Sequence, residues 1–328
     1  MRHANISIFI PHLGCPFNCI FCDQYKITGS DSAVTPDDVY KILNKAASRG
    51  LDNKNTQIAF FGGSFTAIDR KLMTEFLEVA HRFIKGGYFE SIRISTRPDC
   101  IDNDILGILK SYGVKTIELG VQSLDDEVLD LAKRGHTAND SLEAVRLIQD
   151  AGLEAGMQMM CGLPGGNREK DIETAKKIIE TGCKQVRIYP VVVIEGTYLA
   201  TMYKRGEYTP LSVDEAVDTC AILCKMFEDA GVTVLKCGLH SDSGSIAGPF
   251  HPAFGELVRS KIFANEIAEK FGRGDVIEIH CSNRFISIAK GNKGRNQALF
   301  EELGIKASFI VDKTFENGYK IDRIKTNS

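Results

Sequence analysis

Short apolar runs alternate with amphipathic segments along most of this chain, and this alternation restricts the fold more than any other feature. A short apolar run bounded by turn residues predicts a buried strand, and helical spacing of apolar residues predicts a helix. The predicted strands are ISIFI at 6–10, QIAFFGG, SIRIS, TIELGVQ, EAGMQMM and QVRIYPVVV. The predicted helices cover 36–47, 70–85, 101–112, 125–133, 139–151, 170–181 and 213–230. Such an order is typical of a parallel sheet covered by helices.

The number of strand–helix units predicts an incomplete barrel. About six units occupy about 200 residues, whereas a complete barrel of eight units usually needs roughly 250 residues. We therefore predict an α/β fold with a partial (βα)6 barrel over residues 1–239. Ligands of parallel α/β folds bind at the carboxyl ends of the strands. The distinctive motifs all follow predicted strands, namely a cysteine-rich loop, GGS, STRPD, GVQS and CGLPG.

The pattern changes after about residue 240. We expect a helix at 253–271, a hairpin formed by VIEIHCS and RFISIAK around Asn283, a helix at 292–303 and a last strand in ASFIVD. These elements predict a small α+β appendage over residues 240–328. From residue 257 onward it carries 13 Lys and Arg against 9 Asp and Glu, whereas the rest of the chain is acidic.

Composition excludes several classes of protein. The formal net charge of −3 creates no overall attraction to nucleic acid or to an anionic membrane. No apolar run approaches the roughly 20 residues of a membrane span, and the first residues have no cleavage-site pattern, so we expect a cytoplasmic protein. A chain of 328 residues can bury a core without disulfides, so its ten cysteines do not indicate a disulfide scaffold. Cys220 and Cys224, four apart on one predicted helical face, leave a second metal site open beside simple core packing.

Three cysteines lie close together in the segment GCPFNCIFCDQ, which begins at Gly14. Cys15, Cys19 and Cys22 have the spacing C-x3-C-x2-C. Thiolate is the usual ligand of iron–sulfur clusters, and three thiolates leave one iron of a cubane cluster without a protein ligand. An open position is what separates catalytic from structural metal sites. Two alternatives stay open: a zinc site with His12 as fourth ligand, and three unrelated thiols.

The cysteine spacing, with Phe21 before the last cysteine, resembles the radical S-adenosylmethionine (SAM) superfamily. The segment FFGGSFT, with Gly62, Gly63 and Ser64, resembles the glycine motif of that superfamily. The resemblance implies a barrel of radical SAM type, a [4Fe–4S] cluster held by the three cysteines, and SAM. Glycine suits this place because a side chain would block close approach of the backbone to the methionine ammonium group.

Further SAM contacts are implied by resemblance to the oxygen-independent coproporphyrinogen oxidase branch. Ser95, Gln122, Arg134 and Gln158 fall on positions that bind SAM in that branch. Ser95 and Gln158 replace acidic residues, so their hydrogen bonds differ from those of the branch. Arg134 is chemically suited to the methionine carboxylate, because a guanidinium binds a carboxylate through two parallel hydrogen bonds.

A more specific resemblance covers residues 57–240. The motifs RGHT and GLPG and the segment GTYLATMYKRGEYTPL resemble the radical SAM domain of the Elongator catalytic-subunit family. That family modifies the wobble uridine of transfer RNA, using acetyl-coenzyme A and an attached acetyltransferase domain. Here the cysteine spacing is shorter, and the 328 residues leave no room for an acetyltransferase domain. The resemblance therefore implies the fold, the cluster and SAM, without acetyl-coenzyme A or the wobble-uridine product.

These features predict an enzyme that reductively cleaves SAM to a 5'-deoxyadenosyl radical, with transfer RNA or another RNA as substrate. A low-potential flavodoxin or ferredoxin is the implied electron donor. Lys293 and Arg295, in the basic loop KGNKGR, are candidate phosphate contacts, and Tyr189 is a candidate for contact with adenine or substrate. Two alternatives remain: a radical SAM enzyme acting on a small metabolite or tetrapyrrole, and a non-catalytic cluster protein that binds RNA or senses redox state.

Overall fold

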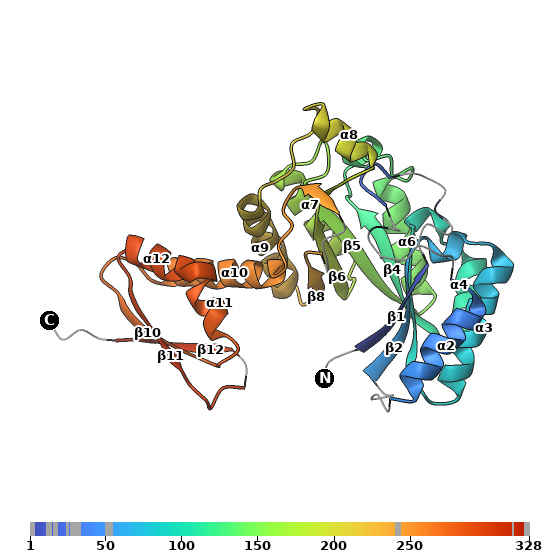
Figure 1. The fold of residues 1–328 in the computed structure, drawn as a ribbon, viewed down its shortest axis with the longest axis horizontal. Helices are drawn as coiled ribbons and strands as arrows, with labels where there is room; N and C mark the ends of the chain where they lie inside the picture. The colour runs from blue at the N-terminus through green and yellow to red at the C-terminus, as the bar shows by residue number, and fades with distance from the viewer. Residues whose placement is uncertain are drawn as a thin grey trace.

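A curled sheet covered by helices and a smaller α+β unit make up the molecule (Figure 1). The computed structural model describes residues 4–10, 15, 19–23, 26, 34–49, 55–239, 244–316 and 318–324. The helix α10 (Phe254–Lys270) connects the large sheet to the appendage.

The large sheet has seven parallel strands in the order β1-β2-β3-β4-β5-β6-β8. They are β1 (Ala4–Ile10), β2 (Thr56–Gly62), β3 (Ser91–Thr96), β4 (Val114–Gln122), β5 (Glu154–Cys161), β6 (Gln185–Pro190) and β8 (Thr233–Cys237). The first and last strands, β1 and β8, are not paired with each other, so the barrel is open. This confirms the predicted partial barrel and adds β8, whose segment TVLKC is too short and too exposed for its sequence to mark it as a strand.

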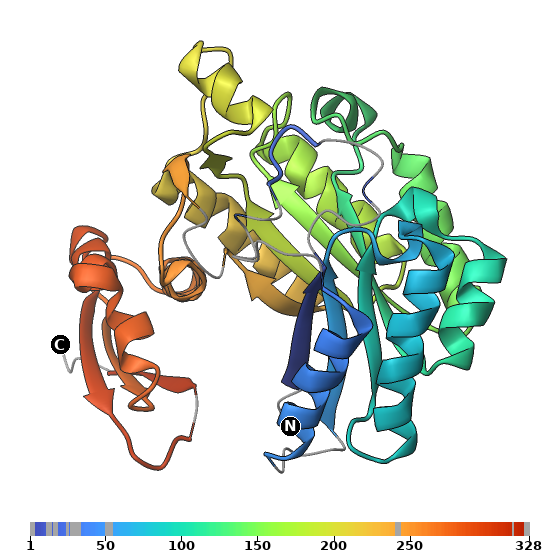
Figure 2. The ribbon, with the colours of Figure 1, turned by 45° about the vertical axis from the view of Figure 1, so that its right-hand side comes forward.

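Helices cover one face of this sheet (Figures 1 and 2). They are α2 (Pro36–Ala47), α3 (Arg70–Lys85), α4 (Asn103–Ser111), α5 (Asp126–Leu131), α6 (Ala138–Asp150), α7 (Arg168–Glu180) and α9 (Val213–Asp229), with short 3-10 turns at Phe65–Ala67 and Pro98–Cys100. Local side chains define where helices begin. Thr35, Thr137 and Ser212 each cap a helix and exchange hydrogen bonds with an acidic residue three positions on.

The two faces of the sheet differ in character. The face toward the helices is apolar and includes Ile58 and Ile94, both fully buried. The opposite face carries a buried ionic network, in which Glu118 of β4 accepts hydrogen bonds from Arg93 Nη1 and Arg187 Nε, both at 2.6 Å. Gly156 of the intervening strand β5 leaves room for this network, because a Cβ there would lie 3.3 Å from Glu118 Cγ. The inner face is therefore polar, with its charged side chains held by one another.

A separate two-stranded sheet joins the segment after β6 to the segment after β8. β7 (Val193–Ile194) pairs in antiparallel fashion with β9 (Ser245–Ala247), and α8 (Tyr198–Lys204) follows β7 directly. This segment contains the GTYLATMYKRGEYTPL motif.

The appendage has a three-stranded sheet in the order β11-β10-β12. Its elements after α10 are β10 (Val276–Cys281), α11 (Ile286–Lys290), a 3-10 turn at Asn292–Gly294, α12 (Arg295–Glu302), β11 (Lys306–Val311) and β12 (Tyr319–Arg323). β10 is parallel to β11 and antiparallel to β12.

The predicted hairpin in the appendage is wrong. RFISIAK contains the helix α11, although its alternating apolar residues resemble a strand. Asn296 Nδ2 donates to the carbonyl oxygens of Ile288 and Ala289 at 3.1 Å, and the Ser260 hydroxyl donates to Ile288 O at 2.9 Å. These distant polar contacts and burial against α10 stabilise a helical turn here. The strand that continues the sheet after α12 is β11, and β12 was not predicted.

The helix α10 belongs to two cores. Phe254 and Val258 pack into the core of the barrel, and Phe263 and Ile267 pack into the core of the appendage. The helix also packs against α9, where Lys261 Nζ lies 2.9 Å from Asp218 Oδ1. The domain boundary at 239/240 stays a prediction, since one helix contributes to both units.

Candidate functional site

The three cysteines follow β1, at the carboxyl end of the strands. Cys15 is exposed, whereas Cys19 and Cys22 are half-buried. The backbone N–H of Cys22 donates to Cys19 O at 3.1 Å, which forms a tight turn. His12, the candidate fourth zinc ligand, lies outside the residues that the structure describes.

Two other segments hold this loop in place. Ile20 N–H donates to Ala132 O at 3.3 Å, and Leu199 N–H donates to Ile20 O at 2.8 Å. The side chains of Ile20 and Phe21 are buried in an apolar cluster that includes Leu163. The GTYLATMYKRGEYTPL motif therefore has a structural role: its segment packs against Ile20 and Phe21 in the cysteine loop.

The glycine motif brings β1 and β2 together below the cysteine loop. Gly62 has a φ of +107°, and a Cβ there would lie 3.3 Å from three backbone atoms of Ile10. Gly63 N–H donates to Ile10 O at 3.0 Å. Only glycine meets both demands at position 62 without strain. The motif thus fixes the point at which the chain leaves β1 for the cysteines.

Ser64, which follows the two glycines, connects three segments. Its buried hydroxyl lies 2.9 Å from Thr96 Oγ1 and accepts from the Arg97 N–H at 3.2 Å. Ser64 also lies beside the thiols of Cys15 and Cys100 and acts to lower the pKa of each, against the effect of burial. Ser64 therefore ties the end of β3 to the first cysteine.

Arg134 reaches from the turn after α5 to the cysteine loop. Its Nη1 donates to Cys19 Sγ at 2.9 Å and its Nη2 donates to Gly120 O at 2.6 Å. The side chain is only 5% exposed, and Nε has no hydrogen-bond partner among the described residues. A buried guanidinium with an unused donor can take one more acceptor, such as a carboxylate.

Arg97, Asp99 and His136 surround Arg134, and none of the three was a predicted site residue. Arg97 Nη2 donates to Arg134 O, and Arg97 Nε lies 2.9 Å from Asp99 Oδ1. Burial and the nearby Arg134 and Arg97 lower the pKa of His136 to about 4, so the imidazole is neutral near pH 7. The position of STRPD after β3 was the only sequence signal for Arg97 and Asp99.

The two guanidiniums affect the thiols beside them. Burial raises the pKa of Cys15, while the Ser64 backbone and the charges of Arg97 and Arg134 act in the opposite direction. These cations favour the thiolate form that an iron–sulfur cluster requires.

The other predicted SAM contacts lie on strands of the same sheet. Gln158 Nε2 donates to Gln122 Oε1 at 3.4 Å, and Gln122 has a φ of +68° at the bulged end of β4. Ser95 lies on β3, two residues after Arg93 and on the same face of the strand. Tyr189 of β6 lies near Arg187, and burial raises the pKa of its hydroxyl. The structure thus brings Gln122 and Gln158 together.

Lys293 and Arg295 lie on the appendage, apart from the cysteine loop. Lys293 is exposed and has a φ of +54°. Arg295 forms an exposed ion pair with Asp214 at the start of α9, with Nη1 2.5 Å from Oδ1. The charge of Arg295 is thus already partnered, and the appendage is joined to the barrel at this point.

Metal binding at the cysteine loop rests on donor chemistry. Within the described ranges, no three His, Cys, Asp or Glu side chains are arranged to hold a metal ion. The three thiols nevertheless fit an iron–sulfur cluster by type and number, and Arg134 places a cation on one of them.

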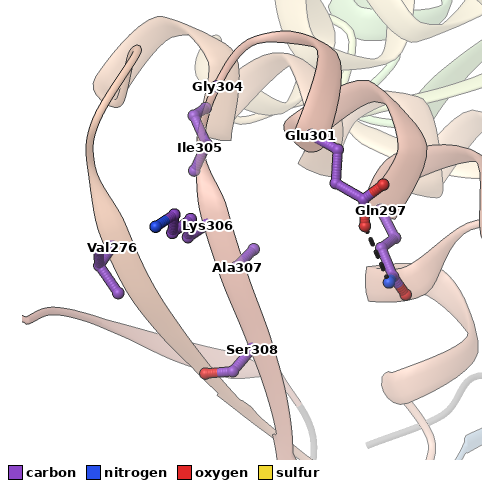
Figure 3. Close-up of a pocket in the computed structure, with 8 residues that line it drawn as sticks. All are labelled: Val276, Gln297, Glu301, Gly304, Ile305, Lys306, Ala307 and Ser308. Atoms are coloured by element: carbon purple, nitrogen blue, oxygen red, sulfur yellow. Dashed lines mark hydrogen bonds between the residues drawn. The ribbon is translucent and has the colours of Figure 1, made fainter.

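A hollow on the appendage is separate from this site (Figure 3). It has a volume of about 480 Å³ and lies between α12 and the edge strand β11. Its lining residues are Val276, Gln297, Glu301, Gly304, Ile305, Lys306, Ala307 and Ser308. On the α12 side of the hollow, Gln297 Nε2 donates to Glu301 Oε1 at 3.2 Å. Among the described residues, no helix is long and apolar enough to span a membrane.

Curated relatives match part of the chain in sequence. The tRNA uridine(34) acetyltransferase of Methanocaldococcus jannaschii is 43% identical over 129 residues, which are 38% of this chain and 24% of the relative. The protein of the same name from Dehalococcoides mccartyi is 28% identical over 241 residues, covering 62% and 52%. Elongator complex protein 3 of Saccharomyces cerevisiae is 30% identical over 185 residues, covering 50% and 33%. The matches thus span between a quarter and about half of these relatives.

A solved structure supports the fold. Archaeal Methanocaldococcus infernus Elp3 with an N-terminal deletion superposes with a TM-score of 0.63 at 22% identity, over 81% of this chain and 63% of that one. Two family models match in sequence: the Radical SAM superfamily over residues 9–178 and the Radical_SAM C-terminal domain over residues 183–263. The resemblance to Elongator relatives is therefore confirmed. With three cysteines, a glycine cradle and a matching model over half its length, this chain belongs to the radical SAM superfamily.

Proposed function

We propose that this radical SAM enzyme modifies an RNA, with transfer RNA as the preferred substrate. The superfamily uses a [4Fe–4S] cluster and SAM, which on one-electron reduction supply a 5'-deoxyadenosyl radical that abstracts a hydrogen atom from the substrate. Cys15, Cys19 and Cys22 would hold the cluster and leave one iron for SAM. The observation that carries the proposal is the hydrogen bond from Arg134 to Cys19, which joins the ends of β1 and β4 at one buried cation.

The residues around this bond suit SAM. The unused Nε of buried Arg134 suits the methionine carboxylate. Gly62 and Gly63 have no side chains that would block the approach of the amino group to the backbone. Ser64 supports that turn through its bonds to β3. We further propose that Ser95, Gln122 and Gln158, on the ends of adjacent strands, contact the remainder of SAM. Phe21, buried with Ile20, would keep water away from it.

The proposal of RNA as substrate draws on two observations. The first is that the names of two matched relatives refer to a tRNA uridine. The second is a set of exposed cations on the appendage: Arg284, Lys290 and Lys293, none with an ion-pair partner among the described residues. Such unpaired cations suit phosphates better than Arg295, whose charge Asp214 already partners. Tyr189 is proposed as a contact for adenine or for the substrate.

The first experiment measures SAM cleavage. Protein reconstituted anaerobically with iron and sulfide is reduced with dithionite, and 5'-deoxyadenosine is quantified with and without bulk transfer RNA. We expect product, and more of it when RNA is present. Product without stimulation would favour a small metabolite or tetrapyrrole as substrate. An assembled cluster that yields no product would favour the non-catalytic alternative.

A variant tests the RNA surface separately. Replacing Arg284, Lys290 and Lys293 with Gln should weaken transfer RNA binding and reduce the salt dependence of binding by roughly one unit of slope for each phosphate that the protein no longer neutralises. A matched control replaces three exposed lysines on other faces, Lys45, Lys85 and Lys184. Equally weakened binding in both variants would contradict a specific surface. SAM cleavage without RNA should be unchanged in both.

We also propose that a low-potential flavodoxin or ferredoxin supplies the electron and that the enzyme works in the cytoplasm. Dithionite replaced by reduced flavodoxin in the same assay tests the donor. The product formed per reduced carrier distinguishes a productive donor from an inert one.

A further inference from the structure

Four cysteines outside the candidate site meet in the core of the barrel. We call them the core thiol group: Cys161, Cys220, Cys224 and Cys237. Cys161 Sγ lies 3.6 Å from Cys220 Sγ, and the thiols of Cys220 and Cys224 both interact with that of Cys237. The proposed RNA modification uses none of them.

The fold explains why these residues meet. Cys220 and Cys224 are one turn apart on α9, which packs across β5, β6 and β8. Cys161 ends β5 and Cys237 ends β8, on either side of β6. Contacts between distant segments, not spacing in sequence, therefore align the four thiols.

The group runs from the edge of the sheet to its interior. Cys237 is half-buried in the edge strand β8, Cys224 is 4% exposed, and Cys220 and Cys161 are fully buried. Among the described residues no three such side chains converge as a metal site. The contacts join the thiols in pairs, and pairs suit the formation and exchange of disulfides.

We propose that the core thiol group is a thiol–disulfide relay that accepts oxidising equivalents from a small disulfide at Cys237 and passes them inward to Cys161. The Cys237 thiolate attacks one sulfur of the small disulfide, which releases one small thiol and leaves a mixed disulfide. Cys220 then attacks the Cys237 sulfur, forms the Cys220–Cys237 bond and releases the second small thiol. Two protein thiols are oxidised and one disulfide is reduced to two thiols, which take up the two protons.

The last step is an exchange within the group. Cys161 attacks the Cys220 sulfur, so that a Cys161–Cys220 disulfide forms and Cys237 is released as a thiol. The two sulfurs must move from 3.6 Å to about 2.05 Å apart, the length of a disulfide bond.

The environment of Cys237 suits the first step. Hydrogen bonds from Cys220 and Cys224 lower the pKa of Cys237 to about 5, although burial acts in the opposite direction. The thiolate is the reactive form of cysteine, so Cys237 is the thiol that reacts first.

The relay ends next to the cysteine loop. Cys161 O accepts from the Val191 N–H at 3.0 Å, and the next residue, Gly162, accepts from the Tyr208 hydroxyl at 2.6 Å. Leu163 then packs with Ile20 and Phe21 of the cysteine loop. Closing the Cys161–Cys220 bond therefore pulls on the segment that supports the candidate site. This inference does not depend on RNA being the substrate.

The test uses the anaerobic protein with its cluster assembled and oxidised glutathione as the small disulfide. After quenching in acid and differential alkylation, peptide mapping locates each disulfide, while absorbance follows the cluster. We expect one disulfide per chain within the core thiol group, loss of two free thiols and an intact cluster. The variant Cys237→Ser should slow this oxidation by at least about tenfold, because the reactive thiolate is absent.

Two further variants keep the test decisive. Cys183→Ser changes a buried cysteine with no thiol partner among the described residues and should oxidise like the parent. Cys161→Val should stop the relay at the Cys220–Cys237 disulfide, which mapping would reveal even if Cys237→Ser folds poorly. The proposal would be overturned by disulfides formed first among Cys15, Cys19 and Cys22, by glutathione retained on Cys237 without an internal bond, or by a bound metal ion that protects the whole group.

Discussion

Two groups of cysteines in this chain have different surroundings. Cys15, Cys19 and Cys22 lie in a loop at the carboxyl ends of the strands, where Arg134 donates directly to Cys19. The core thiol group lies on the helix side of the same sheet, within the apolar core, where Cys161 Sγ is 3.6 Å from Cys220 Sγ. Cations stabilise thiolates for metal binding, whereas thiols in mutual contact favour exchange among themselves. The neighbours of a cysteine, more than its burial, therefore decide its chemistry.

The largest effect should follow from Cys19→Ala. We expect loss of the cluster and of all 5'-deoxyadenosine formation, with a change of less than about 1 kcal/mol in the free energy of unfolding, because the side chain is a half-buried loop residue. Iron content, product yield and urea unfolding measure the three quantities. Cys183→Ala is the matched control and should keep its cluster. Product from Cys19→Ala would remove the distinction between the two groups.

The second effect concerns the cation beside the loop. Arg134→Gln should lower SAM affinity and cluster retention by roughly 10- to 100-fold, the range seen when groups around a metal ligand are removed. Arg134→Lys should restore little of the SAM affinity and cluster retention, because a single ammonium cannot donate to both Cys19 and Gly120 as the two guanidinium nitrogens do. Equilibrium binding of SAM and iron content provide the readouts.

The exposed Arg146, which pairs with Glu143 and Asp150 of its own helix α6, provides the control for that experiment. Arg146→Gln should leave both readouts unchanged. If Arg134→Gln behaved like Arg146→Gln, the proposed role of the buried cation would be wrong.

The third effect is a pH dependence of stability. His136 has a pKa of about 4 in the folded chain and 6.5 as an ordinary histidine, so the unfolded state binds more protons between these values. Stability should therefore fall as the pH drops from about 6.5 to about 4, by about 3 kcal/mol at most. Urea unfolding of parent and His136→Gln at several pH values measures it, and the variant should lose this part of the slope.

A buried carboxyl acts in the opposite direction. Burial raises the pKa of Asp171 to about 7, so the folded state binds more protons than the unfolded state between about 4 and 7. Its contribution makes stability fall as the pH rises through that window. Asp171→Asn isolates this slope.

Identical pH profiles for the parent and His136→Gln would show that the imidazole is not buried as the structure has it.

The smallest effect should follow from Cys220→Ala. Removing the sulfur leaves a small cavity, which should cost about 1 kcal/mol of unfolding free energy, while the cluster and SAM cleavage stay intact. Calorimetry or urea unfolding measures the first and the deoxyadenosine assay the second. A loop variant that changes only function and a core variant that changes only stability would sharpen the comparison. Loss of the cluster in Cys220→Ala would show that the core thiol group also supports the cluster, and would contradict the comparison between the two groups.

Sequence patterns predicted the barrel better than the appendage. Six strands of the large sheet were predicted because each is a short apolar run with turn residues at its ends. In the appendage, α11 has the alternation of a strand, but Ser260 and Asn296 bond its carbonyl groups from elsewhere in the chain. The strand β8 was missed because TVLKC, at the edge of the sheet, lacks the apolar pattern of buried strands.

The candidate site was predicted in part. The three cysteines and the glycine motif are visible in the sequence because each is a local pattern. Arg97 and His136 lie within the motifs STRPD and RGHT, but neither motif assigned them a role, since their importance comes from their position beside Arg134. The alignment of Cys161 and Cys237 with α9 was equally invisible, although Cys220 and Cys224 had drawn attention by their spacing.

The sequence alone determined the order of strands and helices in the barrel, the thiols available for a cluster and the glycine needed at position 62. Those properties depend on residues a few positions apart, where backbone geometry and side-chain periodicity act directly. Only the tertiary structure decided that Arg134 reaches Cys19, 115 residues away, and that the thiols of Cys161 and Cys220 lie 3.6 Å apart. Such contacts follow from the order of the strands in the sheet, which places distant segments side by side and lets burial and charge act between them.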